Sequence, residues 1–271
     1  MTDYRIASDG LPARVVERWA EEKLHYVDGY IDIFTTGMKD LWARLVYIDL
    51  FSGPGLSIIE GTSTEIPGSP TLALQSRYGF ARCYLNDLDQ SAFDALRARF
   101  GSDERAIIRH LDCNDAALDA IEAVELDRPR TLSLAVIDPT GFQIELDSIA
   151  NLTRGRPIDL IITVMTGHLR RFIGTASMER RLDRFFGSVD WRSLVDIRES
   201  GGRVTYRQLL DAYEDGLRAI GYSHVDDDVR ILNKHEGVIY HLVFASKHPR
   251  GADFFRKISR RRFRGQYRLP M

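Results

Sequence analysis

Short apolar runs alternate with helical patterns through the middle of this chain, and that alternation limits the folds open to it. The runs have the length and composition of strands and cover residues 45–51, 81–87, 106–112, 132–138 and 159–165. Helical patterns lie between them at 71–77, 91–100, 116–124 and 146–152. A strand followed by a helix and another strand is the unit of a parallel sheet with crossover helices. The sequence therefore predicts an α/β fold, with a mostly parallel sheet and helices on both faces.

The two flanks are predicted to extend the same domain. Apolar residues between Val16 and Phe34 recur at helical spacing, which indicates an amphipathic helix or a broken pair of helices over about 12–37. Residues 169–224 carry a further helical pattern. Strand-like runs at 229–233 and 238–245 are separated by the turn-like KHEG, so we expect them to pair antiparallel.

We find no internal repeat or long linker, so one domain is expected over 1–271. Its parts are an N-terminal helical segment (1–40), the alternating core (41–168), a helical insertion (169–224) and closing strands with a basic tail (225–271). The 271 residues are 44% hydrophobic, which suffices for a substantial core. No apolar run approaches the roughly 18 residues that span a bilayer, and no leader pattern begins the chain. We expect a cytoplasmic protein.

Two cysteines, Cys83 and Cys113, are too few for a disulfide framework and lack the spacing of a zinc site, so no metal is predicted. The C-terminal end is strongly basic. From Arg250 onward the only acid is Asp253, against eight basic residues: Arg250, Arg256, Lys257, Arg260, Arg261, Arg262, Arg264 and Arg268. This tail could bind a polyanion such as nucleic acid, or it could be the basic face of a final helix that docks on the protein's own acidic surface.

A glycine loop, DLFSGPG, follows the first strand-like run. In parallel sheets the ligand crevice lies beyond the carboxyl ends of the strands, so Gly53 and Gly55 are placed where a main chain can approach a ligand closely. The third glycine of a dinucleotide fingerprint and the GK[ST] of a phosphate loop are missing. The loop alone fits a binding site and a structural turn equally well.

Acids at the other strand ends favour the binding site. Asp87 ends the second run, where a carboxylate can accept both hydroxyls of a ribose, and Asp89 is placed to cap the next helix. Asp112 ends the third run and could accept a hydrogen bond from an adenine amine. Helix capping is the other reading, and it suits Asp115 better than Asp112. Asp138 ends the fourth run, so four acids, counting Asp49 of the first, are predicted to share one edge.

Taken together, these motifs resemble class I S-adenosylmethionine-dependent methyltransferases, and in detail the three-Cys-motif partner (TcmP) family. The resembling segments keep their order from Trp19 to Gly251: WAEEKLHYVDGY, YIDLFSGPG with GSPTLAL, HLDCND, VIDPTGF and YHLVFASKHPRG. The resemblance implies a Rossmann-like seven-stranded sheet whose last pair includes an antiparallel strand. It also implies S-adenosylmethionine as cofactor and a companion protein with a three-cysteine, radical-SAM-like motif.

The cofactor residues implied by the resemblance follow the strand ends. Asp49, Gly53 and Gly55 are expected around the methionine part, Asp87 at the ribose and Asp112 near the adenine. The predicted cofactor site also includes their neighbours Phe51, Leu88 and Cys113, together with Asp138.

The predicted catalytic residues are Asp138, Phe142 and His168. Amine methyltransferases commonly place an acid or amide, two prolines and an aromatic residue at the fourth strand end. Here the second proline is replaced and the aromatic Phe142 comes one residue later, so orientation of an amine by Asp138 is only one possibility. His168 follows the fifth run and could be a base or a surface histidine. No cysteine lies where cytosine-C5 enzymes need one.

We therefore predict a methyltransferase, with nucleic acid or a nucleic-acid-associated target as the lead substrate class. The alternatives are a non-catalytic protein that keeps the fold to bind its companion, and a methyltransferase for a peptide or small molecule.

Overall fold

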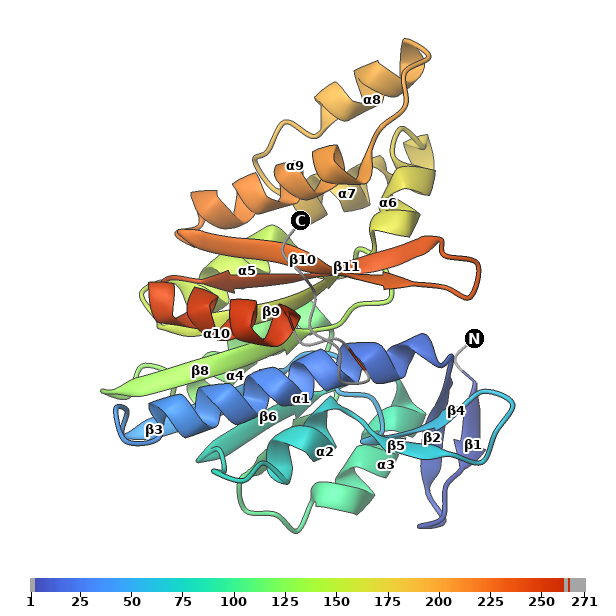
Figure 1. Cartoon of the computed structure of the whole chain (residues 1–271). Coiled ribbons are helices and arrows are strands. Elements are labelled where there is room, and N and C mark those ends of the chain that lie inside the picture. Colours follow the sequence, from blue (N-terminus) through green and yellow to red (C-terminus); the bar gives the residue numbers. More distant parts are fainter. Residues whose placement is uncertain (1–2, 261–262, 264–271) are drawn as a thin grey trace.

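The computed structural model describes residues 3–260 and residue 263. Its main sheet has seven strands in the order β10-β11-β9-β8-β3-β6-β7, and all except β11 run in the same direction (Figure 1). The predicted mostly parallel sheet with one antiparallel strand in its closing pair is thereby confirmed. The strands are β3 (Arg44–Asp49), β6 (Arg82–Asn86), β7 (Ala106–Arg109), β8 (Thr131–Ile137), β9 (Ile158–Val164), β10 (His224–Leu232) and β11 (Val238–Ser246).

All five expected parallel strands are present, and each ends one to three residues earlier than expected. The acids of the motifs therefore lie at a strand end or just beyond it. From β3 the chain first adds β6 and β7 on one side and then returns to add β8 and β9 on the other. This reversal places a switch point between β3 and β8, where open α/β sheets bind their ligands.

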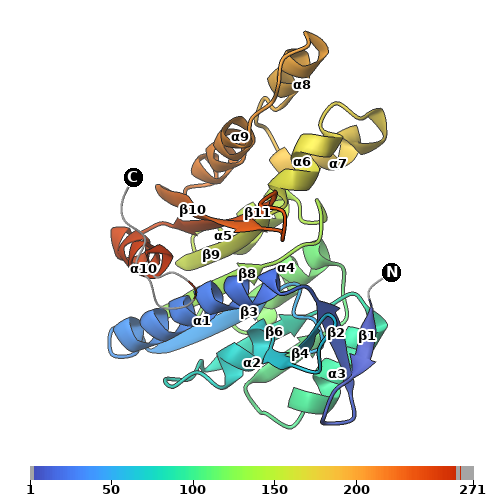
Figure 2. The same ribbon diagram turned by 45° about the vertical axis from the view of Figure 1, so that its right-hand side comes forward.

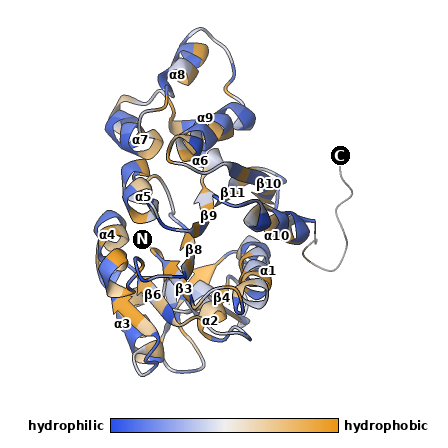
Figure 3. Ribbon diagram, turned by 90° about the vertical axis from the view of Figure 1, so that its left-hand side faces the viewer, coloured by the Kyte–Doolittle hydropathy of each residue, from blue (hydrophilic) through white to orange (hydrophobic). Residues whose placement is uncertain are grey.

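Helices cover both faces of the sheet, so every residue of β8 and β9 is buried. Figure 3 shows the apolar strands between α4 and α5 on one side and α1, α2 and α10 on the other. In addition, α3 packs against β7. The helices are α1 (Trp19–Met38), α2 (Ser69–Leu74), α3 (Gln90–Phe100), α4 (Cys113–Ala123), α5 (Leu146–Thr153) and α10 (Pro249–Ser259).

A small second sheet was not predicted. It has the order β1-β2-β4-β5, and its strands are β1 (Tyr4–Ile6), β2 (Pro12–Val16), β4 (Leu56–Ile59) and β5 (Glu65–Pro67). The expected helix over 12–37 is wrong at its start, because PARVV pairs in parallel with β4 and α1 begins only at Trp19. Valine favours the strand conformation, but only pairing with the distant strand β4 decides between a strand and the start of a helix here. As a result β2 lies beside the glycine loop.

The insertion between β9 and β10 is helical, as expected. It contains α6 (Thr166–Phe172), the 3-10 turn η1 (Ala176–Met178), α7 (Glu179–Phe186), α8 (Arg192–Glu199) and α9 (Tyr206–Ala219). These helices rise beyond the β10–β11 edge of the sheet in Figures 1 and 2. Phe185 stacks on Tyr213 and Phe186 stacks on Trp191, which gives this region an aromatic core of its own. Within the described residues, no helix is both long and apolar enough to cross a membrane.

Candidate active site

Two adjoining cavities open at the carboxyl ends of β3, β6 and β8. The loop compartment, about 540 Å³, lies between the glycine loop and the start of α1. The ribose-side compartment, about 330 Å³, lies over Asp87 and Asp112. They form one crevice because both are lined by Arg14, Phe51, Asp138 and Thr140. The crevice is therefore at the switch point of the sheet.

The glycine loop forms part of the wall of the loop compartment. Gly53 and Gly55 have φ angles of +62° and +90°, which side-chain-bearing residues rarely adopt. A Cβ at Gly55 would lie 2.6 Å from the Phe100 ring, whereas a Cβ at Gly53 would meet nothing within 4 Å. Gly55 is thus needed for the fold, and Gly53 leaves free space in the wall of the loop compartment.

Asp87 ties the glycine loop to the end of β6. Its Oδ2 accepts a hydrogen bond of 2.7 Å from the Gly53 amide, and its Oδ1 accepts one of 2.9 Å from the Asp89 amide. The Arg14 guanidinium lies 3.9 Å from Oδ2. Each carboxylate oxygen can accept a further hydrogen bond, and Asp87 lines the ribose-side compartment. Asp89 caps α3 through the Ala92 amide, as predicted.

Asp112 is the N-cap of α4, where it accepts a hydrogen bond of 2.9 Å from the Asn114 amide. This corrects the expectation that capping suits Asp115 better: Asp115 lies inside the first turn, because the helix begins at Cys113. Asp112 and Cys113 nevertheless line the ribose-side compartment. Burial raises the pKa of the Cys113 thiol to about 12, so it stays protonated. Leu88, 62% exposed, lies at the rim.

Asp49 lies behind the crevice rather than on its surface. It is completely buried and accepts hydrogen bonds from the Ser69 hydroxyl at 2.6 Å, the Phe51 amide at 3.1 Å and the Tyr47 hydroxyl at 3.1 Å. Burial raises its pKa to about 7, although these three donors oppose the shift. Ser69 itself lines the loop compartment. Any effect of Asp49 on a ligand is therefore transmitted through Ser69 and the loop.

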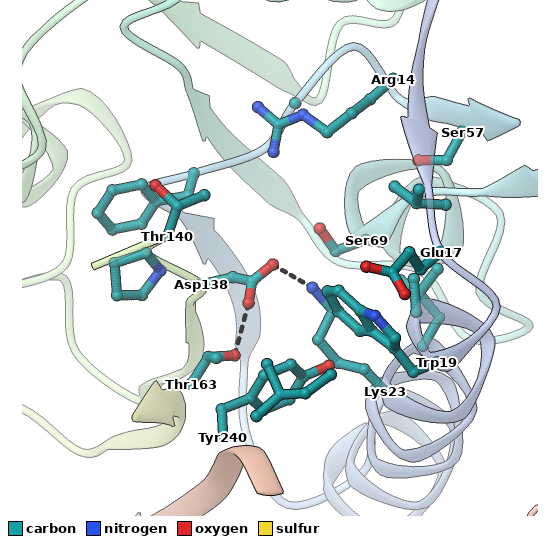
Figure 4. A pocket seen from close by; sticks show the side chains of 18 of the residues that line it. Arg14, Glu17, Trp19, Lys23, Ser57, Ser69, Asp138, Thr140, Thr163 and Tyr240 are labelled. Atoms are coloured by element: carbon teal, nitrogen blue, oxygen red, sulfur yellow. Dashed lines mark hydrogen bonds and ion pairs between the residues drawn. The ribbon is translucent and has the colours of Figure 1, made fainter. Parts of the chain in front are cut away.

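Asp138 is already paired in this structure. Its Oδ2 accepts a hydrogen bond from the Lys23 ammonium of α1, and its Oδ1 accepts one from the Thr163 hydroxyl (Figure 4). Burial by itself would raise the pKa of Asp138, but Lys23 and Thr163 hold it below its ordinary value. The sequence reasoning missed Lys23, although this residue lies within the motif WAEEKLHY.

The other two predicted catalytic residues lie in different places. His168 of α6 lines the loop compartment, and burial followed by the Arg171 charge lowers its pKa, which leaves the imidazole neutral near pH 7. Phe142 does not line either compartment. It is 4% exposed and packs edge-to-face on Phe185, 5.4 Å away, inside the core. The prediction that Phe142 is a catalytic residue is therefore corrected: Phe142 packs in the core.

The N-terminal segment closes the crevice more than the insertion does. Arg14 of β2 and Trp19 and Lys23 of α1 line the loop compartment, and residues 169–224 contribute nothing to its lining. Trp19 meets Tyr240 of β11 edge-to-face at 5.4 Å. Among the described residues, no group of three or more histidine, cysteine, aspartate or glutamate side chains is placed to hold a metal ion.

No protein-family model matches the chain, and no curated protein matches it in sequence. Solved structures do match in shape. Protein LPL1258 from Legionella pneumophila gives a TM-score of 0.49 at 13% identity and covers 84% of this chain and 89% of its own. Human methyltransferase-like protein 13, in complex with S-adenosylhomocysteine, gives 0.44 at 14% identity with coverage of 92% and 95%.

The N-methyltransferase NodS from Bradyrhizobium japonicum, also in complex with S-adenosylhomocysteine, gives 0.42 at 9% identity with coverage of 86% and 89%. These identities are low. The fold assignment therefore depends on the sheet within this chain, which has the predicted seven, mostly parallel strands and one antiparallel strand in its last pair.

Proposed function

We propose that this protein is an S-adenosylmethionine-dependent methyltransferase. The observation that carries the proposal is the placement of the Gly53 loop, Asp87 and Asp138 around one crevice at the switch point of the sheet. A merely structural turn at Gly53 would not need the free space that this residue leaves in the wall.

The crevice fits the cofactor in its shape and in its polar groups. The ribose-side compartment offers Asp87 to the ribose hydroxyls and Asp112 to the adenine, and the loop compartment takes the methionine part. Arg14 lines both compartments, and its Nε atom is buried without a hydrogen-bond partner in the described part of the chain. A buried donor of this kind is suited to an anionic ligand group such as a carboxylate.

The cofactor, when bound, supplies a methyl group on a sulfonium, which leaves as a neutral thioether. The protein then has to align the acceptor and exclude water. Trp19 and Tyr240 close the side of the loop compartment, and Lys23 holds Asp138 in position. His168, neutral near pH 7, accepts the proton that an O–H or N–H acceptor releases.

Nucleic acid is the lead acceptor class in this proposal. It is supported by the basic C-terminal segment, of which Arg250, Arg256 and Lys257 lie on α10. Of the tail's other basic residues, Arg260 is described, whereas Arg261, Arg262, Arg264 and Arg268 lie outside the described residues. A linear fall of log affinity with log salt, for a single-stranded oligonucleotide followed by fluorescence anisotropy, tests this part.

A second candidate function is a non-catalytic partner that binds a companion protein with the three-cysteine motif. The observation in its favour is that the two residues expected to contact the methyl acceptor already contact other parts of the protein. Phe142 packs in the core, and Asp138 pairs with Lys23. Isothermal titration calorimetry with S-adenosylhomocysteine decides whether the cofactor site is functional. Binding with a Kd in the micromolar range supports the methyltransferase, and absence of binding refutes it in favour of the partner function.

A further inference from the structure

We infer that the crevice selects a planar methyl acceptor through an oxygen atom, which accepts hydrogen bonds from Trp19 and Tyr240, and rejects an acceptor that presents an amino group there. We call the side of the loop compartment formed by Trp19, Lys23 and Tyr240 the acceptor wall. This inference rests on the proposed function, because it concerns the acceptor side of the same crevice.

The first step is that the charge of Asp138 is already paired with the Lys23 ammonium. Each of its carboxylate oxygens already accepts a hydrogen bond, one from Lys23 and one from Thr163. Figure 4 shows the Lys23 ammonium paired with Asp138, so a substrate amine would have to compete with this ion pair. Displacing it would leave two charges to be re-solvated in a partly buried site, which is costly. An exocyclic amine is therefore a poor match for this side of the crevice.

The second step is that the acceptor wall carries unpaired donors. The Trp19 Nε1 and Tyr240 hydroxyl are both buried without a hydrogen-bond partner among the described residues, and Tyr240 is only 1% exposed. Each unpaired donor destabilises the folded protein, and native proteins keep few of them outside functional sites. Both residues line the loop compartment. The centroids of the two rings lie 5.4 Å apart, so the proposed ligand oxygen has both side chains within reach.

The third step concerns the rest of the surroundings. Met165 and Ile239 also line the compartment and add apolar surface that suits a flat apolar group. Tyr240 and Trp19 meet edge-to-face with an interplanar angle of 75°. Both donor atoms are sealed in this structure, so the Trp19 side chain has to move aside when the ligand enters. Its place at the first residue of α1 makes that movement local.

A keto-bearing nucleobase and an aromatic carboxylate share the chemistry that the acceptor wall recognises. Two pairs of probes distinguish these two ligand classes: uridine against cytidine, which carry an oxygen and an amino group respectively at C4, and benzoate against benzylamine. The dissociation constants are measured by ligand-detected NMR titration of the protein saturated with S-adenosylhomocysteine. We expect the oxygen member of at least one pair to bind about tenfold more tightly than its amino partner.

Tyr240→Phe removes one donor and keeps the ring, and it should reduce that preference to less than about threefold. Tyr213→Phe is the matched control. The Tyr213 hydroxyl is equally buried and also lacks a hydrogen-bond partner within residues 3–260 and 263, but it lies in the aromatic core of the insertion and does not line the crevice. Both variants should fold, because each loses an unsatisfied buried hydroxyl, and only Tyr240→Phe should change probe binding.

The inference is overturned by equal binding within both pairs, by tighter binding of the amino probe in both pairs, by no binding of either oxygen probe at about 10 mM, or by an unaltered preference in Tyr240→Phe. Calorimetry with S-adenosylhomocysteine on the same samples keeps the two proposals apart. If that ligand does not bind, the proposed function fails. If it binds and the probes show no preference for oxygen, only the inference fails.

Discussion

Replacing Asp87 by alanine tests the predicted ribose ligand most directly. The carboxylate accepts hydrogen bonds from the Gly53 amide at 2.7 Å and the Asp89 amide at 2.9 Å, so its loss affects the protein even without a ligand. The Gly53 amide is buried, and leaving it unpaired should lower the free energy of unfolding by about 1–3 kcal/mol. The Asp89 amide is partly accessible, so water replaces most of what it loses.

The effect on ligand binding is separate and additional. A carboxylate that accepts hydrogen bonds from two ribose hydroxyls contributes about 1.5–3 kcal/mol, which corresponds to roughly 10- to 150-fold in the dissociation constant of S-adenosylhomocysteine. Calorimetry measures that constant, and urea denaturation measures the stability loss independently. Both are recorded at a temperature where circular dichroism shows the variant to be folded.

Asp119→Ala is the matched control for this measurement. Its carboxylate accepts hydrogen bonds from the Tyr84 hydroxyl and the Arg109 guanidinium, so its loss should also lower stability, yet Asp119 lines neither compartment. We expect wild-type affinity for S-adenosylhomocysteine in Asp119→Ala. If Asp87→Ala binds as tightly as the wild type, or if both variants weaken binding equally, Asp87 is not a ligand of the ribose.

Three further predictions concern the same crevice. Burial raises the pKa of Asp49 to about 7, so this group stabilises the folded protein below its unfolded-state pKa, and the stabilisation is lost as pH rises through 7. Thermal melts should show that loss in the wild type and not in Asp49→Asn. Lys23→Met should lower the free energy of unfolding by about 1–3 kcal/mol by leaving Asp138 unpaired, and adding Asp138→Asn should restore most of it; additive effects in the double-mutant cycle would contradict the pairing. Gly55→Ala should destabilise by about 1–3 kcal/mol more than Gly53→Ala in urea denaturation, since only its Cβ meets a ring; equal losses would refute a steric role for Gly55.

The sequence was sufficient for the main sheet because its signals are local. Each of the five parallel strands lies in a short, mostly apolar run, and the central strands β8 and β9 are buried on both faces, so no alternation confuses the pattern there. The acids that follow these runs lie at or near the strand ends, since the boundaries shifted by only one to three residues. Asp87 and Asp138 therefore lie at the crevice, as their positions at the ends of strand-like runs predicted, although their roles there stay predictions.

The second sheet could not be read in the same way. PARVV has no local feature that separates a short strand from the start of a helix, and its partner β4 lies some forty residues further along the chain. Only that pairing brings Arg14 to the crevice. The acceptor wall has a similar origin, because Trp19 and Tyr240 come from opposite ends of the chain and meet only when α1 packs beside β11.

Composition and local pattern alone thus determined the α/β class, the strand positions and the edge where the carboxylates gather, because burial and backbone geometry act over a few neighbouring residues. Which carboxylate is free was decided by tertiary packing. In the folded protein Asp49 lies behind Ser69, Lys23 pairs with Asp138, and the aromatic Phe142 packs in the core. The charge and contacts of a buried group depend on the side chains that the whole fold brings within reach, so the sequence alone could not predict them.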